Sequence, residues 1–288
     1  MTRALVTGAS GFLGRHLVRH LLAEGWEVTA LQRESTVDSL AAEASDGLMV
    51  VPFADAVEAQ QLAREAAPDR VFHLATLYLK DHRPEDIDPL FAANVLFGTH
   101  LLEGLRGSGA VVLNANSFFQ FRDSQPRPYS LYSASKQSFL DVCAYYREVA
   151  GLDIRQVVLF DTFGPRDTRD KLVPALMRAA RTRSSVTLGP SAQQLNLLFS
   201  QDVVTALVAA TEDDAPPMMA IRAERATTVG ELVTLVGEVS SAPLTASFND
   251  GGATSDVAST SGDWPVPPRW KAKHSLREGL ALTFAQAD

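Results

Sequence analysis

The sequence predicts an α/β fold, a doubly wound, Rossmann-type parallel sheet followed by a smaller C-terminal region. Three observations predict it. In the first half of the 288-residue chain, short apolar runs alternate with helical stretches, which is the pattern of right-handed βαβ units. The runs are apolar almost throughout, as in strands that are covered on both faces. A glycine-rich turn separates the first run from the first helical stretch.

The expected elements follow in order along the first half of the chain. They are the strand RALVTG, the helix LGRHLVRHLLAEG ending near Gly25, and the strands EVTALQ and GLMVVPF. A helix near 57–67, the strand RVFHLAT, a helix at about 87–106 and the strand AVVLNAN come next. A helix from about Tyr132 to Ala150 and the strand DIRQVVLF complete this half. Residues 1–160 are therefore expected to form the Rossmann domain.

The pattern changes after Phe160. A loop and a basic helix in DTFGPRDTRDKLVPALMRAARTRSS precede another helix in FSQDVVTALVAATED. Residues 240–268 are rich in Ser, Gly, Asp and Pro, which is typical of a surface loop, although a flap over a substrate is the alternative. We expect residues 161–288 to be mainly a substrate-binding region, with some elements returning to the Rossmann domain.

Composition narrows the range of functions. Hydrophobic residues make up 46% of the chain and the formal net charge is −8, which argues against nucleic acid and anionic membranes as partners. No apolar run approaches the roughly 20 residues of a membrane span. The N-terminus enters a strand at once, and the lone Cys143 cannot form an intrachain disulfide. We therefore expect a cytoplasmic protein, and we assign no metal site.

The glycine turn TGASGFLG predicts dinucleotide binding. Gly8, Gly11 and Gly14 lie between the first strand and the first helix, where glycine permits a tight turn and a close approach of a pyrophosphate. The N-terminus of the following helix adds free N–H groups and a positive dipole. The spacing is G-x-x-G-x-x-G rather than the commoner G-x-G-x-x-G.

The end of the second strand bears on the choice of cofactor. An acid at that position binds a ribose 2′-hydroxyl, whereas an arginine favours a 2′-phosphate. Here the strand ends in Gln32 and Arg33, and the first acid is Glu34. The sequence therefore favours NADP(H), with NAD(H) as the alternative.

A tyrosine and a lysine one helical turn apart, Tyr132 and Lys136 in SLYSASKQSF, predict proton transfer. A phenol has a pKa near ~10, and we expect the neighbouring ammonium to lower it and to bind the nicotinamide ribose. The phenol would then act as general acid or base beside the carbon that exchanges a hydride. Ser117, with Asn116 beside it, follows an apolar strand and could polarise the substrate oxygen.

These motifs together resemble the extended short-chain dehydrogenase/reductases. The glycine turn, HLAT, Asn94 in AANVLFGTH and YSASK carry the resemblance, and VVLFDTFGPRD and QDVVTALVAA continue it. The chain looks most like the NAD-dependent epimerase/dehydratase branch, which acts on nucleotide sugars. The resemblance implies an enzyme, with Tyr132, Lys136 and Ser117 as catalytic residues. It further implies a cofactor site at Gly8, Gly11, Phe12, Leu13, Gly14, Arg33, Asp55, Ala56, Leu74, Ala75, Asn94, Tyr132 and Lys136.

Several departures from the family pattern bear on the reaction. Phe118 and Phe119 replace the adjacent acids of sugar 4,6-dehydratases, which argues against dehydration, and we expect these aromatics to be core. Asp161 replaces a usual Asn, and Leu195 and Asn196 replace a basic residue and an acid. The leading hypothesis is NADPH-dependent reduction of a nucleotide-linked 4-keto-6-deoxysugar. The alternatives are an NAD-dependent nucleotide-sugar 4-epimerase and a non-catalytic NADP-binding regulator.

Two expectations concern binding of other molecules. Basic residues in an otherwise acidic chain could attract the substrate pyrophosphate, and with Asn116 they form the expected substrate-binding set: Asn116, Lys171, Arg178 and Arg269. The helices near 87–106 and 133–149 carry apolar residues on more than one face. In the family such helices pair between subunits, so we expect a homodimer.

Overall fold

A seven-stranded parallel sheet forms the centre of the computed structural model, which describes all residues except 36–39, 41–44, 123–124, 242–243, 252–263 and 287–288. The strand order is β3-β2-β1-β4-β5-β8-β13, and every neighbouring pair is parallel. The strands are β1 (Arg3–Thr7), β2 (Glu27–Arg33), β3 (Leu48–Phe53), β4 (Arg70–His73), β5 (Val111–Ser117), β8 (Asp153–Leu159) and β13 (Met218–Ile221). The predicted doubly wound fold is confirmed.

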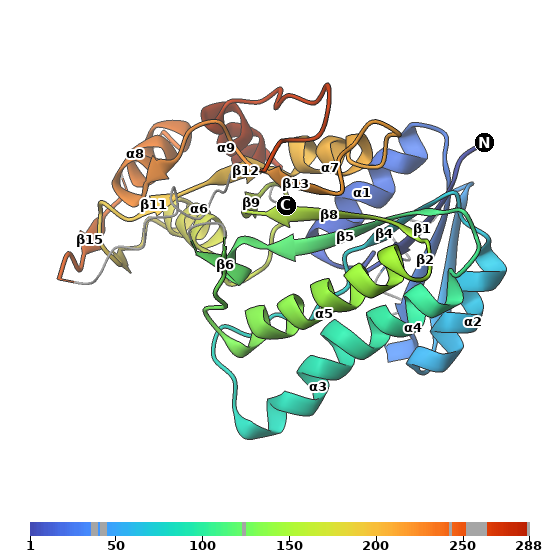
Figure 1. Cartoon of the computed structure of the whole chain (residues 1–288). Helices are drawn as coiled ribbons and strands as arrows, with labels where there is room; N and C mark the ends of the chain where they lie inside the picture. Colours follow the sequence, from blue (N-terminus) through green and yellow to red (C-terminus); the bar gives the residue numbers. More distant parts are fainter. Residues whose placement is uncertain (36–39, 41–44, 123–124, 242–243, 252–263, 287–288) are drawn as a thin grey trace.

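Helices cover both faces of this sheet (Figure 1). On one face lie α1 (Phe12–Ala23) and α7 (Ser200–Ala209), and on the other lie α2 (Ala56–Ala66), α4 (Phe97–Gly104) and α5 (Leu131–Glu148). Each interface has its own apolar core. Leu17, Val18 and Leu207 pack against the first face, while Leu101 and Phe139 pack against the second. Burial on both faces explains why the strands are apolar throughout.

The helix expected at about 87–106 is divided into three parts. It consists of α3 (Ile87–Phe91), a π-helical turn at Ala92–Leu96 and α4, after a 3₁₀ turn at Pro84–Asp86. The π turn contains Asn94, which is buried. Since π turns inside helices are frequent at functional sites, this interruption points to the same region as the motifs do.

The second half of the chain has a separate core. It is formed by α6 (Leu172–Thr182), α8 (Val229–Val239) and α9 (Leu276–Ala285), which bury Leu176, Leu232 and Leu280 together. The sequence analysis assigned neither α8 nor α9, although each begins with a capping box. The short strands are β6 (Phe121–Arg122), β7 (Gln125–Pro126), β9 (Asp161–Phe163), β10 (Val186–Leu188), β11 (Gln194–Leu195), β12 (Leu197–Phe199), β14 (Thr227–Thr228) and β15 (Ala246–Phe248).

The chain returns to the first half through α7 and β13, which adds the last strand of the sheet beside β8. Within the segment 240–268, expected as a loop or a flap, residues 242–243 and 252–263 lie outside the described residues; the described part includes β15, which pairs with β10. Among the described residues, no helix is both long enough and apolar enough to span a bilayer.

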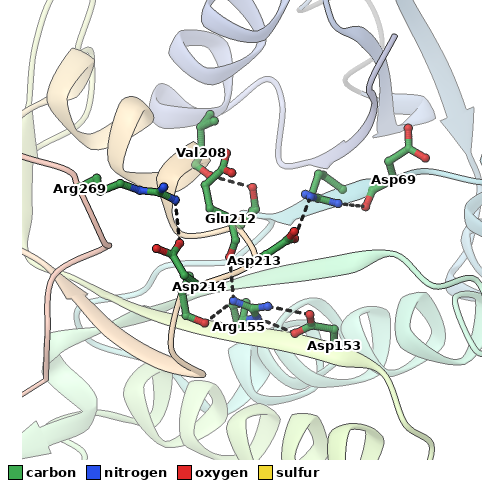
Figure 2. A network of polar contacts seen from close by, with 11 residues as sticks. Asp69, Asp153, Arg155, Val208, Glu212, Asp213, Asp214 and Arg269 are labelled. Carbon is green, nitrogen blue, oxygen red and sulfur yellow. Dashed lines mark hydrogen bonds and ion pairs between the residues drawn. The ribbon is translucent and has the colours of Figure 1, made fainter.

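An ion-pair network fastens the amino-terminal edge of the sheet (Figure 2). The buried Arg155 of β8 binds both carboxylate oxygens of Asp153, at 2.6 and 2.7 Å, and donates to the backbone carbonyls of Glu212 and Ala215. These carbonyls belong to the turn between α7 and β13, so one guanidinium anchors the segment that returns to the sheet.

The strand order also locates the crevice where parallel sheets bind ligands. From β1 the chain continues to β2 on one side, whereas β4 lies on the other side of β1 and continues to β5. The crossovers therefore diverge at β1 and β4, and their carboxyl ends border a crevice. The glycine turn, the residues after β4 and the end of β5 all meet there.

Candidate active site

The conformation of the turn requires two of its three glycines. Gly8 has a φ of 69°, and a Cβ at that position would lie 2.7 Å from the amide nitrogen of Ala75. A Cβ on Gly14 would collide with the carbonyl oxygen of Gly8. Gly11, whose Cβ would lie 3.1 Å from the same oxygen, occupies the N-cap of α1. The turn thus packs directly on the backbone of Leu74 and Ala75.

The N-terminus of α1 has the features that a pyrophosphate needs. Its N-cap, Gly11, has no side chain to occupy the first N–H groups, and the first turn has no acid. Phe12 and Leu13 begin the helix, and the Phe12 ring holds the Arg169 guanidinium 4.1 Å from its centroid. The free donors and the positive helix end fit the phosphates of a dinucleotide.

The ends of β2 and β3 place the remaining expected cofactor residues. Gln32 is buried and Arg33 is exposed at the end of β2. Asp55 is the N-cap of α2, where Oδ1 accepts hydrogen bonds of 2.9 Å from the amides of Val57 and Glu58. Ala56 begins the helix. The capping bonds give Asp55 a structural role that is independent of any adenine contact.

The structure brings Tyr132 and Ser117 together. Ser130 caps α5 and starts the helix so that Tyr132 and Lys136 both face inward, with 7% and 3% of their surfaces exposed. The Tyr132 phenol lies near the hydroxyls of Ser117, at the end of β5, and Thr76, after β4, and both lower its pKa. Sequence reasoning missed Thr76, although its place in HLAT directly after Ala75 was a usable signal.

The effect of Lys136 on the phenol differs from the sequence-based expectation. Burial raises the pKa of Tyr132 above its ordinary value, while the nearby hydroxyls of Thr76 and Ser117 oppose the rise; Lys136 is not among the groups that shift it. Lys136 instead interacts with His73 and Cys143, and burial lowers the pKa of Lys136 to about 8. Within the described part of the chain, no acid lies at ion-pair distance from this lysine.

A row of polar residues crosses four neighbouring strands of the sheet near Lys136. Thr7, His73, Asn114 and Gln156 are register partners on β1, β4, β5 and β8. The His73 Nδ1 lies 2.8 Å from the Thr7 hydroxyl, and burial together with Lys136 lowers the pKa of His73 to about 3. His73 is therefore a neutral, packed residue, consistent with a structural role.

The position of Asn116 argues against its expected contact with substrate. Its side-chain nitrogen donates to Gln156 at 2.7 Å, and its oxygen accepts from Asn114 and from Gln120. The residue is buried. Both ends of the amide are thus engaged in the buried network of the sheet, and a substrate contact of Asn116 stays a prediction; Ser117 is the neighbour that acts on the pKa of the phenol.

Asn94 fastens the loop after β4 to α5. Its Oδ1 accepts from the Thr76 hydroxyl at 3.0 Å and from the Leu77 amide at 2.7 Å, while its Nδ2 donates to the Leu77 carbonyl and the Ser135 hydroxyl. Ser135 in turn donates to the carbonyl of Tyr132. The π turn therefore positions both Thr76 and the start of the catalytic helix.

Of the expected substrate-binding cations, Lys171 lies beside this site. It is the N-cap of α6, and its Nζ lies 4.0 Å from the centroid of the Tyr78 ring. Tyr78 in turn contacts the Tyr132 ring edge-on, with centroids 5.0 Å apart. Lys171 also acts on Asp161, whose pKa is raised by burial and lowered by Lys171 and Arg169.

Two other expected substrate cations lie elsewhere. Arg178, farther along α6, borders a separate cavity of about 360 Å³ with Arg166, Met177 and Arg181. Arg269 forms an ion pair of 2.9 Å with Asp214, which precedes β13 and so lies at the amino-terminal edge of the sheet (Figure 2). This is the opposite end of the sheet from Tyr132, where Arg269 forms a surface ion pair, and its expected contact with substrate stays a prediction.

The aromatic residues after Ser117 are mostly core, as expected. Phe118 stacks on Phe160 with ring centroids 5.2 Å apart, and Phe121 packs edge-on against Trp264 at 4.7 Å. Phe118 and Phe121 are buried, whereas Phe119 is partly exposed and contacts Tyr129. No carboxylate therefore stands at positions 118 and 119 next to the Ser117–Tyr132 pair.

Comparison with known proteins gives the same family as the site. The model of the NAD dependent epimerase/dehydratase family matches residues 4–221. CDP-abequose synthase of Salmonella typhimurium is 26% identical over 73% of this chain and 70% of its own length. UDP-glucose 4-epimerase of Mycolicibacterium smegmatis is 32% identical over 72% of each chain.

The fold has close counterparts among solved structures. The UDP-glucose 4-epimerase of Thermus thermophilus, solved in complex with NAD, superposes with a TM-score of 0.82 over 99% of this chain and 98% of its own, at 23% identity. At that identity the likeness concerns the fold. Taken with the family match and the Tyr132–Ser117 geometry, it shows that the chain belongs to the NAD dependent epimerase/dehydratase family and is an enzyme of the extended short-chain dehydrogenase/reductase type.

Proposed function

We propose that the enzyme reduces a nucleotide-linked 4-keto-6-deoxysugar to the corresponding 4-hydroxy sugar with NADPH. The observation that carries the proposal is the buried Tyr132 phenol, which lies close enough to the Ser117 hydroxyl at the end of β5 for that hydroxyl to lower its pKa. This arrangement suits the transfer of a proton to a carbonyl oxygen.

The residues divide the chemistry of a ketone reduction among them. The reduced nicotinamide, when bound, supplies a hydride to C4. Tyr132 donates its proton to the C4 oxygen as negative charge develops there, and Ser117 donates a hydrogen bond to the same oxygen. Burial raises the pKa of Tyr132, so the phenol retains its proton at neutral pH and is ready to act as an acid.

The cofactor residues follow from the turn and the strand ends. The N–H groups of Phe12 and Leu13 suit the pyrophosphate, while the Gly11 N–H donates to the Gly8 carbonyl and holds the turn closed. Lys136, a buried cation with no acid at ion-pair distance in the described residues, suits the nicotinamide ribose hydroxyls. Leu74, Ala75 and Asn94 are proposed to border the inner part of the pocket, and Asp55 and Ala56 the adenine.

The preference for NADPH rests on the end of β2. Gln32 stands where an acid would bind a 2′-hydroxyl, and the exposed Arg33 can offer a planar guanidinium to a 2′-phosphate. Replacing Arg33 by Gln should weaken NADPH binding and leave NADH binding unchanged. Equal loss for both cofactors, measured by fluorescence titration, would remove this part of the proposal.

The substrate class is supported by the residues around Tyr132 and by two relatives. No acid is present at positions 118 and 119 for the elimination of water, and Lys171 with the uncapped N-terminus of α6 gives a positive region for a pyrophosphate. CDP-abequose synthase is one of these relatives. The other, a dTDP-4-dehydro-6-deoxy-D-allose reductase of Streptomyces bikiniensis, is 26% identical over 83% of this chain.

A direct assay tests the reaction. The purified enzyme is incubated with NADPH and a panel of CDP- and dTDP-linked 4-keto-6-deoxyhexoses, and cofactor oxidation is followed together with the product by mass spectrometry. We expect stoichiometric oxidation and a gain of two hydrogens in at least one sugar. Absence of oxidation with every member of the panel would remove the proposal.

A nucleotide-sugar 4-epimerase is the second candidate, favoured by the 32% identical UDP-glucose 4-epimerase. An epimerase keeps one NAD and returns it to its original oxidation state. It would therefore copurify with NAD and interconvert UDP-glucose and UDP-galactose without net cofactor consumption. Identification of the nucleotide released on denaturation separates the two candidates.

A homodimer is proposed through the α4–α5 face of the molecule. Ile87 of α3, Leu96 of the π turn, and Tyr145 and Val149 at the end of α5 are large apolar residues exposed in the single chain. Leu96, for example, is 56% exposed. Light scattering should give twice the chain mass, and Leu96→Glu should shift the molecule toward the monomer. A monomer throughout the micromolar range would contradict the proposal.

A further inference from the structure

Tyr78 joins the two halves of the enzyme beside the catalytic phenol. It lies in the loop after β4, in the first half, and is 40% exposed. The face of its ring carries the Lys171 ammonium from the N-cap of α6, in the second half, at 4.0 Å from the centroid. Its ring also meets that of Tyr132, with 5.0 Å between centroids and 79° between planes. One half-exposed aromatic therefore touches both the proton donor and the nearest substrate cation.

Each contact has a physical consequence. A cation over an aromatic face is attracted by the ring quadrupole, so the long Lys171 side chain loses much of its freedom. The edge-on contact is the favoured geometry for aromatic pairs and restrains the Tyr132 ring from one side. Thr76, two residues before Tyr78, lies near the phenol oxygen and lowers the pKa of Tyr132. The loop after β4 thus contacts Tyr132 at its oxygen and at its ring.

The charged groups around Lys171 bear on how its side chain is held. Lys171 and Arg169 both lower the pKa of the buried Asp161, and Arg169 is itself held by two 2.8 Å hydrogen bonds to Asp167. Within the described residues, Lys171 has no ion pair of its own. Its ammonium acts on the buried Asp161 and lies over the Tyr78 ring, 4.0 Å from the ring centroid.

We propose that Tyr78 is a positioning and specificity-determining residue, whose ring holds the Lys171 ammonium at the distance from Tyr132 that a nucleotide-linked sugar requires. The inference rests on the proposed function, because it assumes that the sugar carbon at Tyr132 is joined to a pyrophosphate. A shorter or uncharged ketone would gain nothing from the fixed ammonium. Tyr78 would therefore act on substrate affinity through Lys171 rather than on the proton transfer itself.

The test is a double-mutant cycle with Tyr78→Leu, Lys171→Met and the combined variant. Tyr78→Phe keeps the ring and serves as the conservative control, and Lys80→Met is the matched control for loss of an exposed lysine on the same loop. The cycle is measured on KM for the nucleotide sugar and, independently, on calorimetric binding of CDP and dTDP. Binding of NADPH and the melting temperature are recorded for every variant.

We expect Tyr78→Leu to raise KM and to weaken CDP or dTDP binding by roughly 3- to 30-fold, the range of a cation–π contact. Tyr78→Phe and Lys80→Met should match the wild type. In the combined variant the loss should not exceed that of Lys171→Met alone, with kcat and NADPH binding nearly unchanged. Such non-additivity identifies the Tyr78–Lys171 pair, because two unrelated losses would multiply.

Other outcomes overturn the inference. Multiplied losses in the combined variant would show that Tyr78 and Lys171 act separately. A loss confined to kcat, to NADPH binding or to the melting temperature would give Tyr78 a merely structural or catalytic role. If the wild type turns over no nucleotide sugar, the proposed reaction fails, whereas the binding cycle with CDP and dTDP still decides on Tyr78.

Discussion

The two edges of the central sheet each contain a buried cation, and the two cations differ in whether an acid neutralises them. At the amino-terminal edge, the Arg155 guanidinium binds the Asp153 carboxylate and two backbone carbonyls (Figure 2). At the carboxyl-terminal edge, Lys136 is buried with no acid at ion-pair distance among the described residues, beside a neutral His73. The same fold thus contains a satisfied cation and an uncompensated one.

The difference separates structural from functional use of a charge. A buried cation whose donors are all occupied contributes to stability and leaves nothing for a ligand. A buried cation without a counterion destabilises the folded state, and its donors are available to a molecule that enters the crevice. Replacing Lys136 should therefore raise stability and weaken cofactor binding, whereas replacing Arg155 should lower stability and leave the reaction unchanged.

Tyr132→Phe should have the largest effect. Removing the proton donor should lower kcat by about 10²- to 10⁴-fold, the usual contribution of general acid catalysis. NADPH affinity should stay close to that of the wild type, because the aromatic ring at position 132 and its contact with the Tyr78 ring remain. Steady-state kinetics and fluorescence titration check both parts. Tyr145→Phe, an exposed tyrosine on the same helix, should be silent; a similar loss in that variant would contradict the assignment.

Lys136→Met should weaken cofactor binding and stabilise the protein. Lowering the pKa of Lys136 from 10.5 to about 8 costs the folded state on the order of 3 kcal/mol at neutral pH. Between these two values the unfolded chain binds more protons than the folded one, so the wild type should gain stability as the pH rises from about 8 to 10 relative to the variant. Urea unfolding at several pH values measures this difference.

The controls for this prediction are direct. Lys80→Met removes an exposed lysine and should change neither the stability nor its pH dependence. If Lys136→Met is less stable than the wild type at neutral pH, the ammonium is compensated in the folded state, and the contrast between the two edges of the sheet fails.

Arg155→Met should destabilise the protein and leave kcat unchanged. The Arg155 side chain is 9% exposed whereas that of Asp153 is 48% exposed. Because the partner is half solvated, we expect a loss of about 2 kcal/mol, below the usual figure for a fully buried pair. Denaturant unfolding gives the loss, and kcat measured well below the melting temperature should be unchanged. If kcat falls under conditions where the variant is fully folded, the amino-terminal edge of the sheet influences the chemistry at the carboxyl-terminal edge.

Arg269→Met should have the smallest effect. The Arg269 side chain is 74% exposed, and exposed pairs contribute little. Since its partner Asp214 lies at the amino-terminal edge of the sheet, KM for the nucleotide sugar should also be unchanged. A large rise in KM would restore Arg269 as a substrate ligand and would require the C-terminal segment to move on binding.

The local motifs were predictable because each depends on neighbours in the sequence. The glycine turn, the apolar strands and the Tyr132–Lys136 spacing all follow from backbone conformation within one βα unit or one helical turn. The division of the helix at 87–106 by a π turn was missed, because an apolar period does not reveal an extra residue in one turn. The helix α8 was missed too, although its capping box can be read in the sequence.

By itself, the sequence determined the Rossmann-type sheet, the glycine turn before the first helix and the spacing of Tyr132 and Lys136, the proposed catalytic pair, because these depend on short-range patterns. The tertiary structure alone decided which groups meet the phenol. It brought Thr76, Ser117 and Tyr78 to Tyr132, engaged both ends of the Asn116 amide within the sheet, and placed Arg269 at the opposite edge. It also decided the direction of the pKa shift of Tyr132, since desolvation depends on packing from distant segments that no local pattern encodes.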